Sequence, residues 1–176
     1  STIKEKRGEE DDEFEENLLD ERFLDYPPLA VEQSGKTMDR MTAAAFKNLN
    51  KSIDLIHSFD REKYEKIMSR ENTVDRYEDR LGAYLVRLNT KELSEKETRE
   101  TAKFLHCLTN VERISDHAVN LAELAQEMAE KKVSFSPQAE AELNVCIDAV
   151  REIVALAKTA LTDNDLEMAR RVEPLE

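Results

Sequence analysis

The sequence of 176 residues has no tryptophan, only three glycines and four prolines, and no long run of apolar residues. Because glycine and proline are scarce while Ala, Leu, Glu and Lys are abundant, helix is favoured over strand nearly everywhere. No stretch of 18 apolar residues occurs and no signal segment opens the sequence, so no membrane-spanning helix is predicted. Since the chain begins at Ser1 rather than Met, we expect a piece of a longer protein.

Cysteine is also scarce. Cys107 and Cys146 are far apart and both lie in helical patterns, which indicates reduced core thiols rather than a disulfide framework. A reducing, cytosolic setting is therefore expected.

Positive charge is in deficit. The 39 acidic residues exceed the 26 Lys and Arg residues and give a net charge of −13. Such a chain is repelled by nucleic acids and by anionic membrane surfaces. Nucleic acid is thus not an expected partner, whereas cations and basic proteins are.

The chain divides into a tether and a helical body. Most of residues 1–17 are charged, which is typical of a linker that gains too little from burial to order itself. Residues 18–176 are predicted to form one all-α antiparallel bundle. A short apolar group at its start is expected to dock on the main body before Pro27 and Pro28 interrupt the chain: Leu18, Leu19, Phe23 and Leu24.

Apolar residues at intervals of three and four then predict four long helices. The first starts near Pro28, and Asp60 caps the second, which ends near Asn89. A capping box, Ser94-x-x-Glu97, opens the third, which runs to about Lys131, and Ser136-Pro137 opens the fourth. Short connections between long helices predict antiparallel packing of the first three, about residues 29–131.

Residues 136–176 are expected to begin a second, incomplete repeat. The segment Asp60–Glu71 (DREKYEKIMSRE) aligns without a gap with Asp165–Glu176 (DLEMARRVEPLE). This match is short, but it predicts one complete three-helix repeat followed by the start of another.

Carboxylates form a second stripe beside the core stripe on two of these helices. With about 100° per residue, Glu71, Asp75 and Asp79 gather on one side of the second helix. Glu112 and Asp116 do the same on the third helix. If both stripes face the same side, these acids line one groove, where they repel one another unless a multivalent cation neutralises them. Acid-x-x-x-acid spacing alone is a weak signal, since about eight such pairs arise by chance and solvated helix faces are often charged.

Two motifs in the sequence resemble those of the PhoU family of phosphate-transport regulators. The segment Asn110–Glu123 (NVERISDHAVNLAE) is similar to the family signature, and Glu71–Glu78 (ENTVDRYE) is similar to its companion motif. The segment Leu19–Pro28 (LDERFLDYPP) also resembles the version fused to the C-terminus of bacterial sodium/phosphate cotransporters.

The resemblance implies a PhoU-like bundle and a cluster of iron or zinc, mono- or multinuclear, on the bundle surface, which purified protein does not necessarily retain. By resemblance, Glu71 and Asp75 form one metal-binding motif, and Glu112 and Asp116 form the other. Asp79 and His117 are weaker candidates, and a polar contact is the alternative interpretation of His117. The acidic motifs of a second repeat are missing, so only one cluster is expected.

The resemblance further implies a regulatory domain of phosphate uptake on the cytoplasmic side of the inner membrane. Its expected partner is a membrane-embedded phosphate transporter, in the same chain or in another, with a signalling kinase and a homo-oligomer as further candidates. No enzymatic function is predicted. Two alternatives stay open: a metal-free acidic module that binds a basic protein, and a carboxylate-bridged metal enzyme, which needs a buried site that is open to substrate.

Overall fold

The computed structural model describes residues 16–162, and every regular element in that range is helical. Two short 3-10 helices, η1 (Glu16–Leu19) and η2 (Glu21–Asp25), precede four long α-helices. These are α2 (Pro27–His57), α3 (Arg61–Leu88), α4 (Glu95–Lys131) and α5 (Pro137–Thr162). The prediction of an all-α antiparallel bundle is confirmed.

The helix boundaries follow the capping signals in the sequence. The Asp60 side chain accepts a hydrogen bond from the Lys63 backbone N–H at 3.0 Å and so opens α3. Ser94 and Glu97 form the predicted capping box at the start of α4. At the start of α5, the Ser136 hydroxyl accepts a hydrogen bond from the Ala139 N–H at 3.2 Å.

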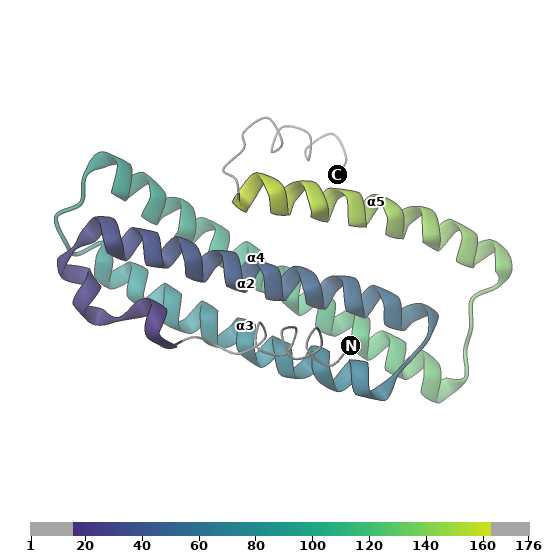
Figure 1. The fold of residues 1–176 in the computed structure, drawn as a ribbon. Helices are drawn as coiled ribbons and strands as arrows, with labels where there is room; N and C mark the ends of the chain where they lie inside the picture. The colour runs from purple at the N-terminus through teal and green to yellow at the C-terminus, as the bar shows by residue number, and fades with distance from the viewer. Residues whose placement is uncertain (1–15, 163–176) are drawn as a thin grey trace, which may run out of the picture.

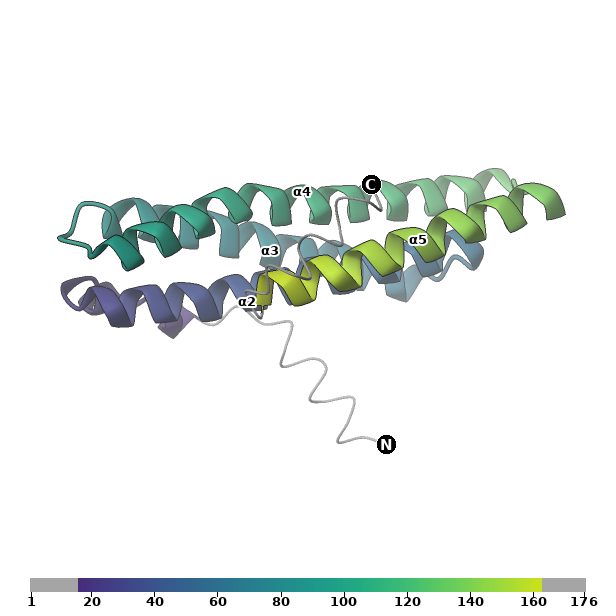
Figure 2. The same ribbon diagram turned by 90° about the horizontal axis from the view of Figure 1, so that it is seen from above.

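Helices α2, α3 and α4 pack against one another as a three-helix bundle, while α5 lies along α2 (Figures 1 and 2). The main core joins all three bundle helices and includes Met38 and Met41 of α2, Leu81 and Leu85 of α3, and Leu108 of α4. Burying a side chain of this size contributes about 1.5 to 3 kcal/mol. Ile147 of α5 packs on Leu49 and Ile53 of α2 in a smaller cluster.

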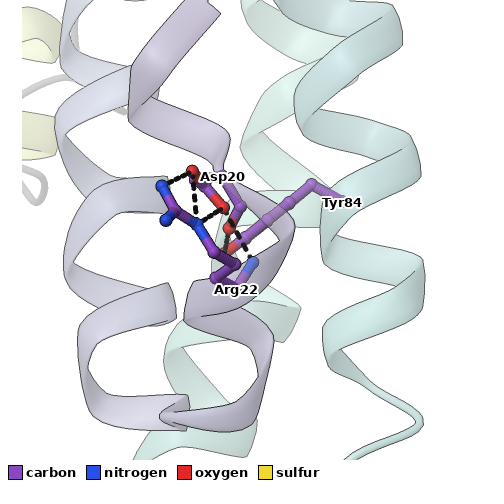
Figure 3. Close-up of polar contacts among 3 residues, drawn as sticks. All are labelled: Asp20, Arg22 and Tyr84. Carbon is purple, nitrogen blue, oxygen red and sulfur yellow. Dashed lines mark hydrogen bonds and ion pairs between the residues drawn. The ribbon is translucent and has the colours of Figure 1, made fainter.

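The predicted apolar group before the first long helix docks on the bundle, as expected. Leu19 and Leu24 are buried in the main core. Tyr84 of α3 donates a hydrogen bond from its hydroxyl to the Asp20 carbonyl at 3.3 Å, and Asp20 pairs with Arg22 beside it (Figure 3). These contacts fix η1 and η2 against α2 and α3.

Polar groups are buried between α2 and α3. Arg70 donates to the Asn48 side-chain oxygen at 2.8 Å, and the Asn48 amide donates to the Ile67 carbonyl at 3.1 Å. Asn48 is fully buried, so these bonds tie the two helices together in one register.

Both cysteines are free, as predicted, but only Cys107 is near the core. Burial raises the pKa of the Cys107 thiol, which makes it less reactive. Cys146 is exposed on α5, so its placement in the core was wrong. Within residues 16–162, the apolar side chains of Val145 and Val150 on α5 are exposed as well.

Parts of the predicted organisation lie outside the described residues. This holds for residues 1–15 of the linker and for Asp165–Glu176, the second half of the proposed sequence repeat. Residues 16 and 17, assigned to the linker, belong to η1. The division into one complete repeat and the start of another stays a prediction.

Candidate metal centre

The structure places the two acidic motifs on facing parts of α3 and α4, helices that pack directly against each other. Glu71 and Asp75 lie one turn apart on α3, and Glu112 and Asp116 lie one turn apart on α4. Glu71 and Glu112 are half-buried, whereas Asp75 and Asp116 are exposed. The four carboxylates therefore sit at the edge of the core, as the helical periodicity predicts.

Ser115 links the two motifs. Its hydroxyl is fully buried and donates a hydrogen bond to the Glu71 carboxylate across the α3–α4 interface. Sequence reasoning missed this residue. The sequence did contain a signal for it. Ser115 lies three residues after Glu112, a spacing that places both residues near the same side of α4.

We define the carboxylate face as Glu71, Asp75, Glu112 and Asp116. Burial, and then negative charges on this face, raise the pKa values of Glu71, Asp75 and Glu112. Burial raises the pKa of Glu71, and the charges of Asp75 and Asp116 raise it further, while the hydrogen bond from Ser115 opposes this. Burial and the charge of Asp116 likewise raise the pKa of Asp75. Such shifts show that each negative charge is disfavoured by its surroundings.

Glu112 joins the same network from α4. Burial raises the pKa of its carboxyl, followed by its interaction with Asp116 and the charges of Glu78 and Asp75. Asp79 contributes a smaller repulsion to Asp75. Within the described residues, the neighbouring charges that shift these three pKa values are all carboxylates.

The donor chemistry suits a multivalent cation, because carboxylate oxygens are ligands of hard cations and mutual repulsion is relieved when such an ion binds. Across residues 16–162, however, no three His, Cys, Asp or Glu side chains are placed to hold one ion together. His117 is exposed, and it is not among the groups that shift the pKa values of Glu71, Asp75 and Glu112. The metal site, including Asp79 and His117, stays a prediction.

Gly82 lies one turn beyond Glu78 on α3, and a Cβ atom at this position would meet Leu108 Cδ2 of α4 at 3.3 Å. The missing side chain thus allows α3 and α4 to approach closely near the acidic motifs.

The model of the PhoU domain matches residues 38–125, which is half of the chain. The chain belongs to the PhoU domain family. The matched part includes all of α3 and most of α4, and with them the whole carboxylate face.

This PhoU domain is also similar to curated proteins. It is 24% identical over 155 residues to a Salmonella typhimurium protein named "Putative inorganic phosphate export protein YjbB", a match that covers 88% of this chain and 28% of that protein. Proteins of the same name from Escherichia coli K12 and Shigella flexneri are each 24% identical over 172 residues, covering 97% of this chain and 32% of theirs. The chain therefore spans less than a third of the length of these relatives. No solved structure gives a significant match.

No helix in residues 16–162 is both long enough and apolar enough to span a membrane.

Proposed function

We propose that this chain is a regulatory domain that controls phosphate transport from the cytoplasmic side of the inner membrane. Membership of the PhoU family supports this role, as does the similarity to proteins named for inorganic phosphate export. The regulated partner is a membrane-embedded phosphate transporter, carried by the same polypeptide or by another, as a PhoU-like tail of a sodium/phosphate cotransporter would be.

The observation that carries the proposal is the carboxylate face within the matched PhoU region. Glu71 and Asp75 of α3 and Glu112 and Asp116 of α4 repel one another and are the residues that would hold a cation, with Asp79 at the margin. Iron or zinc, as one ion or a cluster, is the proposed cation. When bound, it supplies positive charge that offsets the repulsion among these carboxylates.

Regulation then depends on how tightly α3 and α4 are joined. Ser115 orients Glu71 across the interface, so both helices contribute to one charged surface. Neutralising that surface removes repulsion between the helices and changes the charge presented to a partner. A transporter loop or a kinase rich in basic residues would bind the two charge states with different affinity.

A second candidate function is a metal-free module that binds a basic protein, such as a signalling kinase. The absence of three converging ligands in residues 16–162 favours it. Binding of this kind weakens steeply with salt and does not respond to chelators, whereas metal-dependent binding responds to both. No residue is assigned a catalytic role in either function, and a homo-oligomer is compatible with both.

The direct test is phosphate flux in cells that produce the complete natural protein. We would compare wild type with Asp75→Asn/Asp116→Asn, which keeps size while removing two charges. The control is Glu62→Gln/Glu127→Gln, which removes two charges from the same helices at exposed positions.

If the proposal is correct, the variant reaches the membrane at normal abundance, but its phosphate flux no longer responds to the phosphate supply, while the control responds normally. A normal response in Asp75→Asn/Asp116→Asn would show that the carboxylate face does not regulate transport.

A further inference from the structure

A groove of about 780 Å³ lies between α2 and α5, apart from the carboxylate face on α3 and α4. Its walls carry Arg40 and Lys47 from α2, and Arg151 and Lys158 from α5. Asp39 is the acidic residue among its lining side chains. Four cations in one groove stand out in a chain with a net charge of −13.

The cations are regularly placed. On each helix they are seven residues apart, which is about two turns, or about 10 Å along the axis. Seven-residue spacing keeps both side chains of a helix on the same side. Each wall of the groove therefore presents two positive charges in a row.

The pairing of the two walls is fixed by an ion pair at one end of the groove. Arg151 donates to the Asp54 carboxylate at 2.6 Å. The two helices run in opposite directions (Figure 1). Lys47 lies seven residues before Asp54 on α2, and Lys158 lies seven residues after Arg151 on α5. Moving the same distance along both helices from the ion pair therefore brings Lys47 level with Lys158. Two lysines thus come from opposite walls at the same height.

The groove is lined by apolar as well as polar side chains. Phe46 and Val154 are among the apolar lining residues, and Asn50 adds an amide. The Asn50 side-chain nitrogen donates to the Phe46 carbonyl at 3.0 Å. Apolar walls with a few polar groups, in a volume of about 300 to 1,000 Å³, are typical of sites for small ligands.

We propose that this groove binds a multiply phosphorylated anion of nucleotide size. Its phosphate groups would lie between Lys47 and Lys158 and extend toward Arg40, while its apolar part would rest on Phe46 and Val154. Lysine and arginine bind phosphate through charge-assisted hydrogen bonds. A long nucleic acid is disfavoured, since the rest of the surface is acidic.

The cations already take part in interactions within the protein. Arg151 pairs with Asp54, and Arg40, Lys47 and Lys158 each have a polar or electrostatic contact. A ligand must therefore compete for them, which favours an anion of several charges over a single orthophosphate. The acidic segment of residues 9–16, EEDDEFEE, is a rival occupant with complementary charge.

The test is calorimetric titration of the intact chain with ATP, tripolyphosphate, orthophosphate and adenosine in turn. Chelator is present throughout, so that no metal on the carboxylate face can bridge a phosphate. The groove variant is Lys47→Glu/Lys158→Glu. The control, Lys63→Glu/Lys96→Glu, makes the same change of net charge at exposed first-turn positions of α3 and α4, where acidic residues suit the helix dipole. Circular dichroism checks that both variants keep their helices.

We expect ATP to bind more tightly than tripolyphosphate, and both more tightly than orthophosphate or adenosine. The groove variant should lose at least about tenfold in ATP affinity for each lysine replaced, while the control stays within about twofold of wild type. Equal loss in both variants, or no ATP binding to wild type, would overturn the proposal. Binding of a synthetic peptide of residues 9–16, without binding of ATP, would also overturn the proposal, because the groove would then bind a protein segment.

This result is independent of phosphate regulation through the carboxylate face. The titration can show ATP binding in the groove even if Asp75→Asn/Asp116→Asn keeps the normal response of phosphate flux to phosphate supply. It can also show no ATP binding even if that variant loses the response.

Discussion

Ser115 of α4 donates a hydrogen bond to Glu71 of α3, and this bond ties a half-buried residue of the carboxylate face to the opposite helix. A residue of the segment Asn110–Glu123 thus makes a hydrogen bond to a residue of the segment Glu71–Glu78. The two motifs form a single surface because the buried hydroxyl connects them.

Replacing Ser115 with alanine should weaken that connection. We expect Ser115→Ala to lower the free energy of unfolding by about 1 kcal/mol, the usual value of one hydrogen bond. Urea denaturation measures the change. Ser69→Ala, at an exposed position of α3, is the control and should stay within about 0.5 kcal/mol of wild type. Equal stability of the two variants would mean that the Ser115 bond contributes nothing.

The close approach of α3 and α4 depends on Gly82. A Cβ atom there already meets Leu108 at 3.3 Å, so the larger side chain of Gly82→Val must push the helices apart. We expect a loss of about 1 to 3 kcal/mol in unfolding free energy, typical of overpacking. Ala83→Val is the matched control, because Ala83 is exposed one residue away. Helix propensity makes Ala83→Val cost a few tenths of a kcal/mol, whereas it favours valine over glycine at position 82. An unchanged unfolding free energy in Gly82→Val would therefore contradict crowding.

Removing the buried polar contact between α2 and α3 should lower the free energy of unfolding more than Ser115→Ala does. Asn48→Ala removes the acceptor of Arg70 and the donor to the Ile67 carbonyl at a fully buried position. We expect a loss of about 2 to 4 kcal/mol in chemical denaturation. Asn72→Ala removes an exposed amide that bonds to the Met68 carbonyl, and its effect should be below about 0.5 kcal/mol. A small loss in Asn48→Ala would show that the buried amide does not stabilise the bundle.

The contribution of the Asp20–Arg22 pair at the start of η2 should depend on acid pH. The hydrogen bond from the Arg22 side chain lowers the pKa of Asp20 from 3.8 to about 2 (Figure 3). A carboxyl whose folded pKa is lowered stabilises the folded state above its ordinary pKa, and this contribution is lost as the pH falls toward the folded value. The difference in stability between wild type and Asp20→Asn should therefore be constant above about pH 5 and disappear between about pH 4 and 2.

Tyr84→Phe serves as the control for this pH series. It removes the hydroxyl that donates to the Asp20 carbonyl but keeps the Asp20–Arg22 pair. Its difference from wild type should stay constant over the same acid range. If the Asp20→Asn difference persists at pH 2, the ion pair is not its source.

Much of this fold could be predicted from the sequence, because its helix signals are local. Asp60, the Ser94–Glu97 capping box and Ser136-Pro137 mark helix starts where the structure has them. The placement of the acidic motifs beside the core also follows from helical periodicity alone.

Features that depend on how two helices meet could not be predicted in this way. The bond from Ser115 to Glu71, the close approach of Gly82 to Leu108 and the groove lined by both Lys47 and Lys158 all join distant parts of the sequence. The exposure of Cys146 was missed for the same reason, since an apolar helix face predicts burial but not what covers it.

Elemental analysis of protein purified without a metal-affinity tag tests the central claim most directly. Wild type, Asp75→Asn/Asp116→Asn and the control Glu62→Gln/Glu127→Gln would be measured together, before and after incubation with iron or zinc salts. We expect about one or more ions per chain in wild type and the control, and a loss of at least about tenfold in Asp75→Asn/Asp116→Asn. Equal, near-zero metal in all three proteins, with no uptake from added salts, would contradict a metal centre on the carboxylate face.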